Sequence, residues 1–288
     1  MDTFDFSALG TKWSILAFGK TFSDADKKAI LDMMETFENR FSRFRDTSEV
    51  NAFRNIDPGV YEISEMLFQM LERAEELRKL TNGRFDPGLG LLLEEAGYDP
   101  QYRLEPGETE RITLSHWNLE GEKLFIDGPI VFDLGGIGKG FCIDEVATLL
   151  RTLGFQYFLI DAGGDMYGTE KEDGSPFRIA LEWPGKPDTA FGTVELRHQG
   201  LAVSDTFRRR WGKWHHILNP KEKNPVEEVI GVSAVAKNAF DADCMTSVLF
   251  QLSREEIPHV TGILDGQYVV FHSDSTVDVS AHWPGELF

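Results

Sequence analysis

The stretch that most clearly could bind a ligand is residues 133–140, DLGGIGKG, where four glycines occupy six consecutive positions. So few side chains leave the backbone open to a ligand. If a helix begins here, its free N–H groups and dipole favour an anion such as phosphate, and Lys139 adds a positive charge. The spacing matches neither the P-loop nor the dinucleotide-binding glycine pattern. An ordinary strand-to-helix turn therefore explains the loop equally well.

Two acids next to this loop favour a more specific interpretation. Asp133 begins the loop, and we expect Asp144 in the first turn of the helix that follows. Carboxylates repel a phosphate unless a metal ion lies between them. A metal ion is thus the feature that would turn the loop into a phosphate site.

A second group of oxygen donors lies in residues 238–250, which have a helical apolar period. Asp243, Thr246 and Ser247 share the face opposite the apolar one, at spacings of three and four. An acid with two hydroxyls suits a hard cation such as Mg²⁺ or Ca²⁺. The alternative is an acid favoured by the helix dipole, with small polar neighbours facing water. This segment alone favours that alternative.

Two adjacent histidines, His215 and His216, lie in a short expected strand that runs into Asn219 and Pro220. Successive side chains of a strand point to opposite faces, so only one of the two faces a given site. Neutral imidazole can accept a proton near pH 7, although a single histidine on a strand is more often structural.

The elements that must position these residues follow from periodicity and turn signals. We expect residues 131–168 to form a strand, the glycine loop, a helix ending at Gly154, a buried strand at 155–160 and a glycine turn. Ser23 and Ser64 are expected to cap two amphipathic helices. Further strands are expected at residues 10–20, 119–132, 177–181, 190–196, 201–204, 214–220, 229–236 and from 268 onward. Many strands without regular strand–helix alternation predict a single α+β domain over residues 1–288, with mixed or antiparallel sheets and packed helices.

Composition excludes several classes of protein. Of the 288 residues, 41% are hydrophobic, which is ordinary for a globular chain. The net charge of −19 argues against nucleic-acid binding, which needs a basic surface. We see no transmembrane segment and no signal peptide, so we expect a cytoplasmic protein, with a longer exported precursor as the alternative. The net negative charge disfavours the binding of an anionic substrate unless a cation lies at the site. Cys142 and Cys244 lie in apolar helical patterns, so no disulfide framework is expected.

Taken together, these segments resemble the FAD:protein FMN transferase (ApbE) family over most of the chain. The resemblance rests on short motifs in a shared order rather than on any one of them. These are Leu9-Gly10-Thr11, the stretch 42–51 with Phe44 where the family has tyrosine, Gly83-Arg84-Phe85-Asp86-Pro87, the loop 133–140 with Asp144, Gly163-Gly164-Asp165, the stretch 215–220, and Ala242-Asp243 through Ser247.

The resemblance implies an ApbE-like fold and a magnesium-dependent enzyme. Such an enzyme splits FAD at its pyrophosphate, moves the FMN half onto a threonine or serine hydroxyl of an acceptor flavoprotein, and releases AMP. His216 would be the catalytic base. The metal, Mg²⁺ or Ca²⁺, would be held by Gly136 through its carbonyl and by Asp243, Ser247 and Thr246. FAD would be held by Leu9, Phe44, Phe85, Asp86, Asp133, Lys139 and Ile217.

Some positions depart from the family pattern. Leu9 replaces methionine, Phe44 lacks the tyrosine hydroxyl, and Asn219 replaces an aspartate. Asp205 stands where the family has glycine, and an acid there could repel a phosphate. Two alternatives therefore accompany the transferase: a metal-dependent FAD pyrophosphatase that uses water as acceptor, and a catalytically weak FAD-binding protein.

Overall fold

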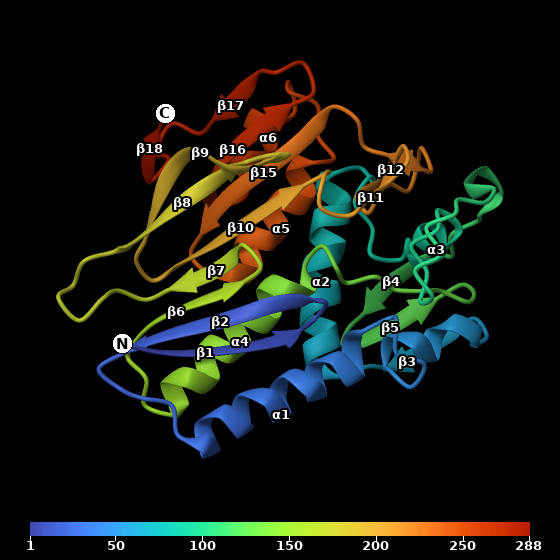
Figure 1. Ribbon diagram of the computed structural model, residues 1–288. Helices are drawn as coiled ribbons and strands as arrows, with labels where there is room; N and C mark the ends of the chain where they lie inside the picture. The colour runs from blue at the N-terminus through green and yellow to red at the C-terminus, as the bar shows by residue number, and fades with distance from the viewer. The chain divides into compact units, whose positions relative to one another are not determined.

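The computed structural model describes all residues, 1–288, and divides them into two compact units. The first unit is Met1–Thr36, Lys139–Arg208 and Glu227–Phe288, and the second is Phe37–Gly138 and Arg209–Val226. Strands and six α-helices follow one another without regular alternation, which confirms the predicted α+β class (Figure 1). None of the helices has the length and apolar character that crossing a bilayer requires.

The first unit is built on an eight-stranded sheet in which every neighbouring pair is antiparallel. Antiparallel pairs can be joined by short turns, and two such turns contain residues of the motifs 9–11 and 163–165. In spatial order the strands are β1 (Asp2–Ala8), β2 (Thr11–Phe18), β6 (Tyr157–Ala162), β7 (Asp165–Gly168), β10 (Gln199–Asp205), β15 (Val229–Ala236), β16 (Gly266–His272) and β17 (Val277–Val279).

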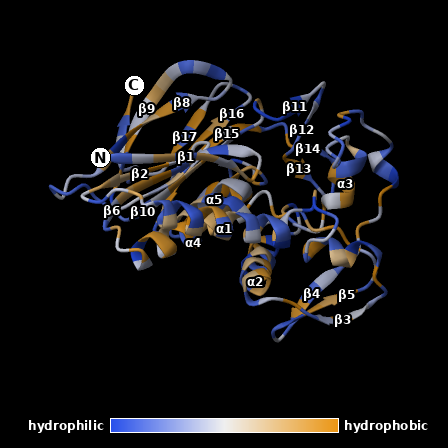
Figure 2. Cartoon of the chain, turned by 60° about the horizontal axis from the view of Figure 1, so that its bottom comes forward, coloured by the Kyte–Doolittle hydropathy of each residue, from blue (hydrophilic) through white to orange (hydrophobic).

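The two faces of this sheet bury different kinds of side chain. On one face, large residues such as Leu201 and Val235 join a core with the smaller sheet β18-β9-β8, formed by Gly285–Leu287, Lys186–Leu196 and Phe177–Trp183. On the other face, Ala202 and Ala236 pack against Ala242 of helix α5 (Ala239–Leu249). Small residues let the helix approach the sheet closely. Figure 2 shows the hydrophobic colouring concentrated along the strands of the large sheet and on α2.

Helix α4 (Gly138–Thr152) packs against α5 in the first unit through Phe141 and Phe240, whose ring centroids are 5.2 Å apart. Helix α1 (Asp24–Phe41) begins in this unit and α6 (Ile257–Thr261) lies near its end. A Cβ at Gly140 would lie 2.4 Å from the Ala239 carbonyl oxygen and 2.7 Å from Asp243 Cβ. Gly140 is therefore required for the close approach of α5.

We expect Gly140→Ala to destabilise the protein by about 1–3 kcal/mol, because the new methyl group meets backbone atoms that cannot rotate away. Gly138→Ala is the matched control: its Cβ would lie 3.4 Å from Leu134 Cβ, an ordinary contact. The control should be neutral or stabilising by up to about 1 kcal/mol. Urea unfolding of both variants measures the difference, and equal effects would contradict the close-approach argument.

The second unit contains the long helix α2 (Glu65–Leu80) and several small sheets. Sheet β3-β5-β4 comprises Gly59–Glu62, Lys123–Ile126 and Trp117–Glu120, and two short hairpins pair β11 (Arg210–Trp211) with β12 (Trp214–His215) and β13 (Leu218–Asn219) with β14 (Asn224–Pro225). Helix α3 (Gly90–Glu95) contributes Leu92 and Leu93 to a core with Trp211 and Trp214. This core fixes the hairpin that carries His215 and directly precedes His216.

The predicted elements agree with the structure wherever local signals are strong. Ser64 caps α2 by accepting from the Leu67 N–H at 3.3 Å, and Ser23 forms the expected capping box with Asp26. Gly154 ends α4 with φ 85°. The predicted strand before the glycine loop is wrong: Val131 makes only a single bridge, with Leu89. The helix also begins earlier than expected, at Gly138, so Asp144 lies in its second turn.

Candidate functional site

The start of α4 is tied to α5 by a buried acid of the first unit. The Gly140 N–H donates to Asp243 Oδ2 at 2.8 Å, and Asp243 is 3% exposed. One of the N–H groups expected to face a phosphate is therefore already bound by a carboxylate. The water-facing alternative for residues 243–247 is wrong, because Asp243 and Thr246 are buried and Ser247 is partly buried.

Asp243 lies beside a second buried acid, Asp165 of β7. Lys139 Nζ is 2.8 Å from Asp165 Oδ2, and Asp165 is 1% exposed. Burial raises the pKa of Asp243 well above its ordinary value, and the charge of Asp165 adds to the shift, whereas Lys139 and the Gly140 N–H oppose it. Two buried carboxylates thus share one ammonium group, which leaves an excess of negative charge.

The oxygen atoms around these acids are of the kind that coordinates a hard divalent cation. The Thr246 hydroxyl donates to the Asp243 carbonyl at 2.9 Å and lies 3.4 Å from Ser204 Oγ. No three His, Cys, Asp or Glu side chains converge in the chain, so a cation here would depend on hydroxyl and carbonyl oxygens as well as carboxylates. Mg²⁺ is commonly held by only one or two carboxylates. The excess charge of the acid pair and the oxygen donors beside it fit such an ion.

Asp144 has a structural role that its position in the motif did not reveal. Its two carboxylate oxygens accept the N–H groups of Ala239 at 3.0 Å and Phe240 at 2.9 Å, at the N-terminus of α5. Burial raises the pKa of Asp144 to about 6, and these two N–H groups only partly oppose the shift. Asp144 therefore holds the helix that carries Asp243.

The raised pKa of Asp144 predicts a pH-dependent contribution to stability. Between its ordinary value near 3.8 and about 6, the folded state binds more protons than the unfolded state, so this contribution falls as pH rises. Asp144→Asn cannot ionise and should lack the decline. In chelator-containing buffer, the stability of the wild type relative to the variant should fall from about pH 4 to about pH 7. Parallel urea-unfolding profiles would contradict this assignment.

The structure brings two motifs of the first unit together at one end of the large sheet. Pairing of Trp13 with Ala162 places the β1–β2 turn, which contains Leu9, next to the glycine turn between β6 and β7. A Cβ at Gly163 would lie 2.1 Å from Thr11 Oγ1, so only glycine fits. Leu9 has φ 50° and is partly buried.

The negative charge of Asp205 is balanced by two backbone N–H groups and by the Arg208 guanidinium. Its Oδ1 accepts the N–H groups of Phe207 at 2.8 Å and Arg208 at 2.9 Å, and its Oδ2 lies 3.3 Å from Arg208 Nε. Arg208 also donates to the Gly163 carbonyl at 3.2 Å. The acid that was expected to repel a phosphate is thus paired with a cation.

In the second unit, Asp133 connects the loop 133–140 with the motif 83–87 and the stretch 42–51. Its N–H donates to the Pro87 carbonyl at 2.7 Å, its Oδ1 accepts from the Gly135 N–H at 2.7 Å, and its Oδ2 pairs with Arg43 Nε. Burial pushes the pKa of Asp133 up, but the charge and hydrogen bond of Arg43 outweigh it and hold the pKa below its ordinary value. Asp133 is therefore a fixed negative charge.

Phe44 and Asp86 lie in settings that explain their residue types. Phe44 stacks on Tyr102 with ring centroids 5.5 Å apart, and the Arg43 guanidinium lies 4.1 Å from the Phe44 ring centroid. Asp86 Oδ1 accepts from the Trp117 Nε1–H and from the Gly88 N–H, both at 2.8 Å. The acid after the buried Phe85 is thus both a turn cap and a side-chain contact.

The two histidines differ in burial, but the predicted single strand over 214–220 is wrong: β12 ends at His215, His216 lies outside it, and β13 begins at Leu218. His215 is buried, its Nε2 lies 3.0 Å from the Val226 carbonyl oxygen, and its Nδ1 accepts from the Ile217 N–H at 3.3 Å. His216 is partly exposed, but its Nδ1 is buried and has no hydrogen-bond partner. Burial, together with the charges of Arg209 and His215, lowers the pKa of His216 to about 3. Of the four ring nitrogens of the two histidines, His216 Nδ1 is the buried one that makes no hydrogen bond.

Asn219 serves a turn as an aspartate would. Its side-chain oxygen accepts from the Lys221 N–H at 3.0 Å. The amide replaces the carboxylate as a cap, because either side chain supplies the oxygen that a turn of this kind needs.

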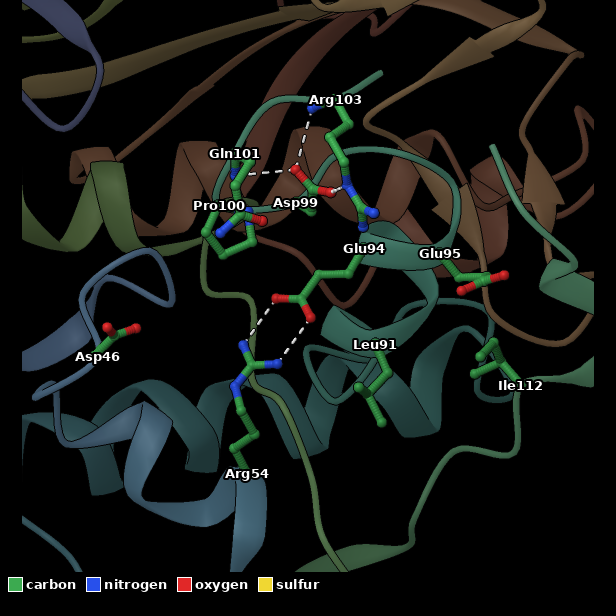
Figure 3. A pocket seen from close by; sticks show the side chains of 10 residues that line it. All are labelled: Asp46, Arg54, Leu91, Glu94, Glu95, Asp99, Pro100, Gln101, Arg103 and Ile112. Carbon is green, nitrogen blue, oxygen red and sulfur yellow. Dashed lines mark hydrogen bonds and ion pairs between the residues drawn. The ribbon is translucent and has the colours of Figure 1, made fainter. Parts of the chain in front are cut away.

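A cavity of about 380 Å³ in the second unit contains none of the predicted site residues (Figure 3). Arg54 donates to both oxygens of Glu94 at 2.8 Å across it, and Asp99 accepts from Arg103 and from the Gln101 N–H. Glu94 and Asp99, two of the acids that line the cavity, are thus already paired with arginines.

Sequence reasoning missed Arg43 and gave Asp165 no function. Arg43 is 3% exposed and also donates to the Tyr98 carbonyl at 2.7 Å. Its position between Ser42 and Phe44 was visible, but its partner lies 90 residues away. A fully buried arginine needs an acid, and that acid is visible only in three dimensions.

The predicted site residues divide between the two units. Leu9, Lys139, Asp243, Thr246 and Ser247 belong to the first unit, and Phe44, Phe85, Asp86, Asp133, Gly136, His216 and Ile217 belong to the second. Within the first unit, Lys139 lies close to the two buried acids Asp165 and Asp243. Within the second, Asp133 is an electrostatic neighbour of His216.

Comparisons with known proteins agree on one family. A model described as the ApbE family matches residues 9–270. The FAD:protein FMN transferase of Vibrio cholerae is 26% identical over 241 residues, covering 77% of this chain and 72% of the relative. The FAD:protein FMN transferase of Haemophilus influenzae is 27% identical over 260 residues, covering 81% and 72%.

Solved structures show the same fold. The ApbE protein of Thermotoga maritima has a TM-score of 0.83 at 21% identity, covering 97% of this chain and 96% of the other. The flavin transferase ApbE of Vibrio cholerae has a TM-score of 0.83 at 22% identity, with the same coverage.

Proposed function

This chain belongs to the ApbE family and is an FAD:protein FMN transferase, and we propose that it uses Mg²⁺ or Ca²⁺ to move FMN from FAD onto a threonine or serine hydroxyl of an acceptor flavoprotein. The family match over residues 9–270 carries the proposal. The buried acids Asp165 and Asp243, with a single ammonium between them, support the cation requirement.

In the proposed reaction, the acceptor hydroxyl oxygen attacks the phosphorus of the FMN half of FAD. A phosphoester bond forms, the bond to the AMP phosphoryl oxygen breaks, and AMP leaves with the electron pair. The hydroxyl proton passes to the base. Such a displacement depends mainly on positioning and on neutralising charge around the phosphoryl oxygens.

We assign roles to residues in both units. His216 is the base. Gly136, through its carbonyl, and Asp243, Thr246 and Ser247 are the proposed metal ligands, and the bound cation supplies charge neutralisation for the diphosphate. The proposed FAD-binding residues are Leu9, Phe44, Phe85, Asp86, Asp133, Lys139 and Ile217.

The pKa of His216 bears directly on its role. At a pKa of about 3 the imidazole is neutral at physiological pH, as a proton acceptor must be, but its intrinsic basicity is low. The cationic Arg209 contributes to the depression after burial. An anionic diphosphate near the ring would raise this pKa again, because a negative charge favours imidazolium. We therefore propose that His216 becomes an effective base only when FAD is bound.

The test uses purified protein, FAD, MgCl₂ and a flavoprotein acceptor domain prepared without its covalent flavin. We expect a fluorescent acceptor band in a denaturing gel and an equal amount of AMP by chromatography. EDTA should abolish both, because the proposed ligands hold a hard cation.

Other outcomes identify the alternatives. Free FMN and AMP in the absence of acceptor would identify a pyrophosphatase. Tight FAD binding without turnover across divalent metals would identify a weak FAD-binding protein, and either result would overturn the proposed transfer onto a protein hydroxyl.

A further inference from the structure

Asp165 is a buried carboxylate that is not among the proposed catalytic, metal-binding or FAD-binding residues. It lies at the start of β7, directly after the Gly163-Gly164 turn, and is 1% exposed. Its Oδ1 accepts from the Val203 N–H of β10 at 2.9 Å, and its Oδ2 lies 2.8 Å from Lys139 Nζ. A charge this deeply buried requires a counter-ion, and Lys139 is that counter-ion.

The same contact determines where the Lys139 ammonium lies. A lysine side chain is a flexible four-carbon stem, so its charge is located by what the ammonium binds. Asp165 Oδ2 makes no hydrogen bond, so the ion pair with Lys139, which is about one-quarter exposed, is its one polar contact. The ammonium is thus held at the start of α4, next to Gly140, whose N–H binds Asp243.

We propose that Asp165 is a positioning residue that holds Lys139 in place for the diphosphate of FAD. This inference rests on the proposed function, in which Lys139 contacts FAD. Asp165 itself does not touch the substrate: it acts through Lys139, and the Val203 N–H fixes the orientation of its carboxylate. A purely structural role, as a tie between β7 and β10, is the competing explanation.

Asp165→Asn separates these explanations. The amide keeps an oxygen for the Val203 N–H but removes the charge that holds Lys139. The variant is combined with Lys139→Met in a double-mutant cycle, which isolates the coupling between the two side chains. Asp161→Asn is the matched control: it lies in the same turn, where Asp161 Oδ1 accepts from the Gly164 N–H at 2.9 Å, and it has no contact with Lys139.

Two measurements are made on all variants: urea unfolding, and kcat and KM for FAD in the acceptor-labelling reaction. We expect Asp165→Asn to lower kcat/KM by about tenfold to a hundredfold in the wild-type background. In the Lys139→Met background the further change should be less than about twofold. Asp161→Asn should keep wild-type kinetics.

The outcomes separate this inference from the proposed function. Equal losses from Asp165→Asn in both backgrounds, or wild-type kinetics in the single variant, would overturn the positioning role. If the wild type transfers no flavin, the transfer proposal fails, and the same cycle applied to the Kd for FAD, measured by flavin fluorescence, decides the inference. Absence of coupling in Kd would then overturn it.

Discussion

Asp243→Asn is expected to lower the rate of flavin transfer by about a thousandfold at saturating FAD and Mg²⁺. The substitution keeps an oxygen for the Gly140 N–H, which Asp243 accepts at 2.8 Å, and removes only the charge. A hard cation bound through few carboxylates loses most of its affinity with one of them. The measurement is the initial rate of acceptor labelling as a function of Mg²⁺ concentration.

The same variant should not lose stability in metal-free buffer. Asp243 is buried beside Asp165, and burial raises the pKa of its carboxyl, so a neutral amide avoids an unfavourable charge. Asp241→Asn is the control, because Asp241 lies in the same helix and pairs with Lys237 at 3.3 Å. An Asp243→Asn protein with the wild-type rate and Mg²⁺ dependence would remove the proposed metal site.

His216→Ala is expected to lower kcat by about 10²- to 10⁴-fold, the usual contribution of a general base, with little change in the Kd for FAD. The reason is that His216 Nδ1 has no hydrogen-bond partner within the protein, so the substitution breaks no hydrogen bond at that atom. Acceptor labelling measures kcat, and flavin fluorescence measures the Kd. A variant that labels the acceptor at the wild-type rate would exclude His216 as the base.

The pH profile gives an independent check on His216. Because its pKa in the free protein is about 3, kcat/KM, which reports the free enzyme, should show no acid limb near the ordinary histidine value of about 6.5. His215→Ala is the matched comparison, since His215 bonds the Val226 carbonyl. It should cost about 1–3 kcal/mol of stability and leave the pH profile unchanged.

The fold was predictable where the signal is local. The caps at Ser23 and Ser64, the C-terminal Gly154 and the strand 229–236 depend on neighbours within a few residues, and the structure has all of them. Strand β1, helix α3 and the short strand β3 were not predicted. The four residues of β3 and the six of α3 are too few to show a clear period, whereas β1 does alternate apolar and polar residues from Phe4 to Ala8 and was overlooked.

The site was predictable only in its components. The family motifs led to the proposed roles of Asp243 and His216, but the partners of the residues in these motifs are distant in sequence. Gly140 is separated from Asp243 by 103 residues, and Arg43 from Asp133 by 90. No local pattern shows that Gly140 makes room for a helix, or that Asp144 caps α5. Those facts depend on tertiary packing, which overrides local propensity.

The hairpin of β11 and β12 imposes a constraint on chain length. Its two-residue turn at Gly212 and Lys213 pairs Arg210 with His215, and side chains alternate between faces along each strand. One inserted residue in this turn would move the His215 side chain to the opposite face of the hairpin, since a slip of one position inverts every side chain after it. The length of this turn is therefore constrained, and so is Gly212, whose φ of 57° lies in the left-handed region that favours glycine.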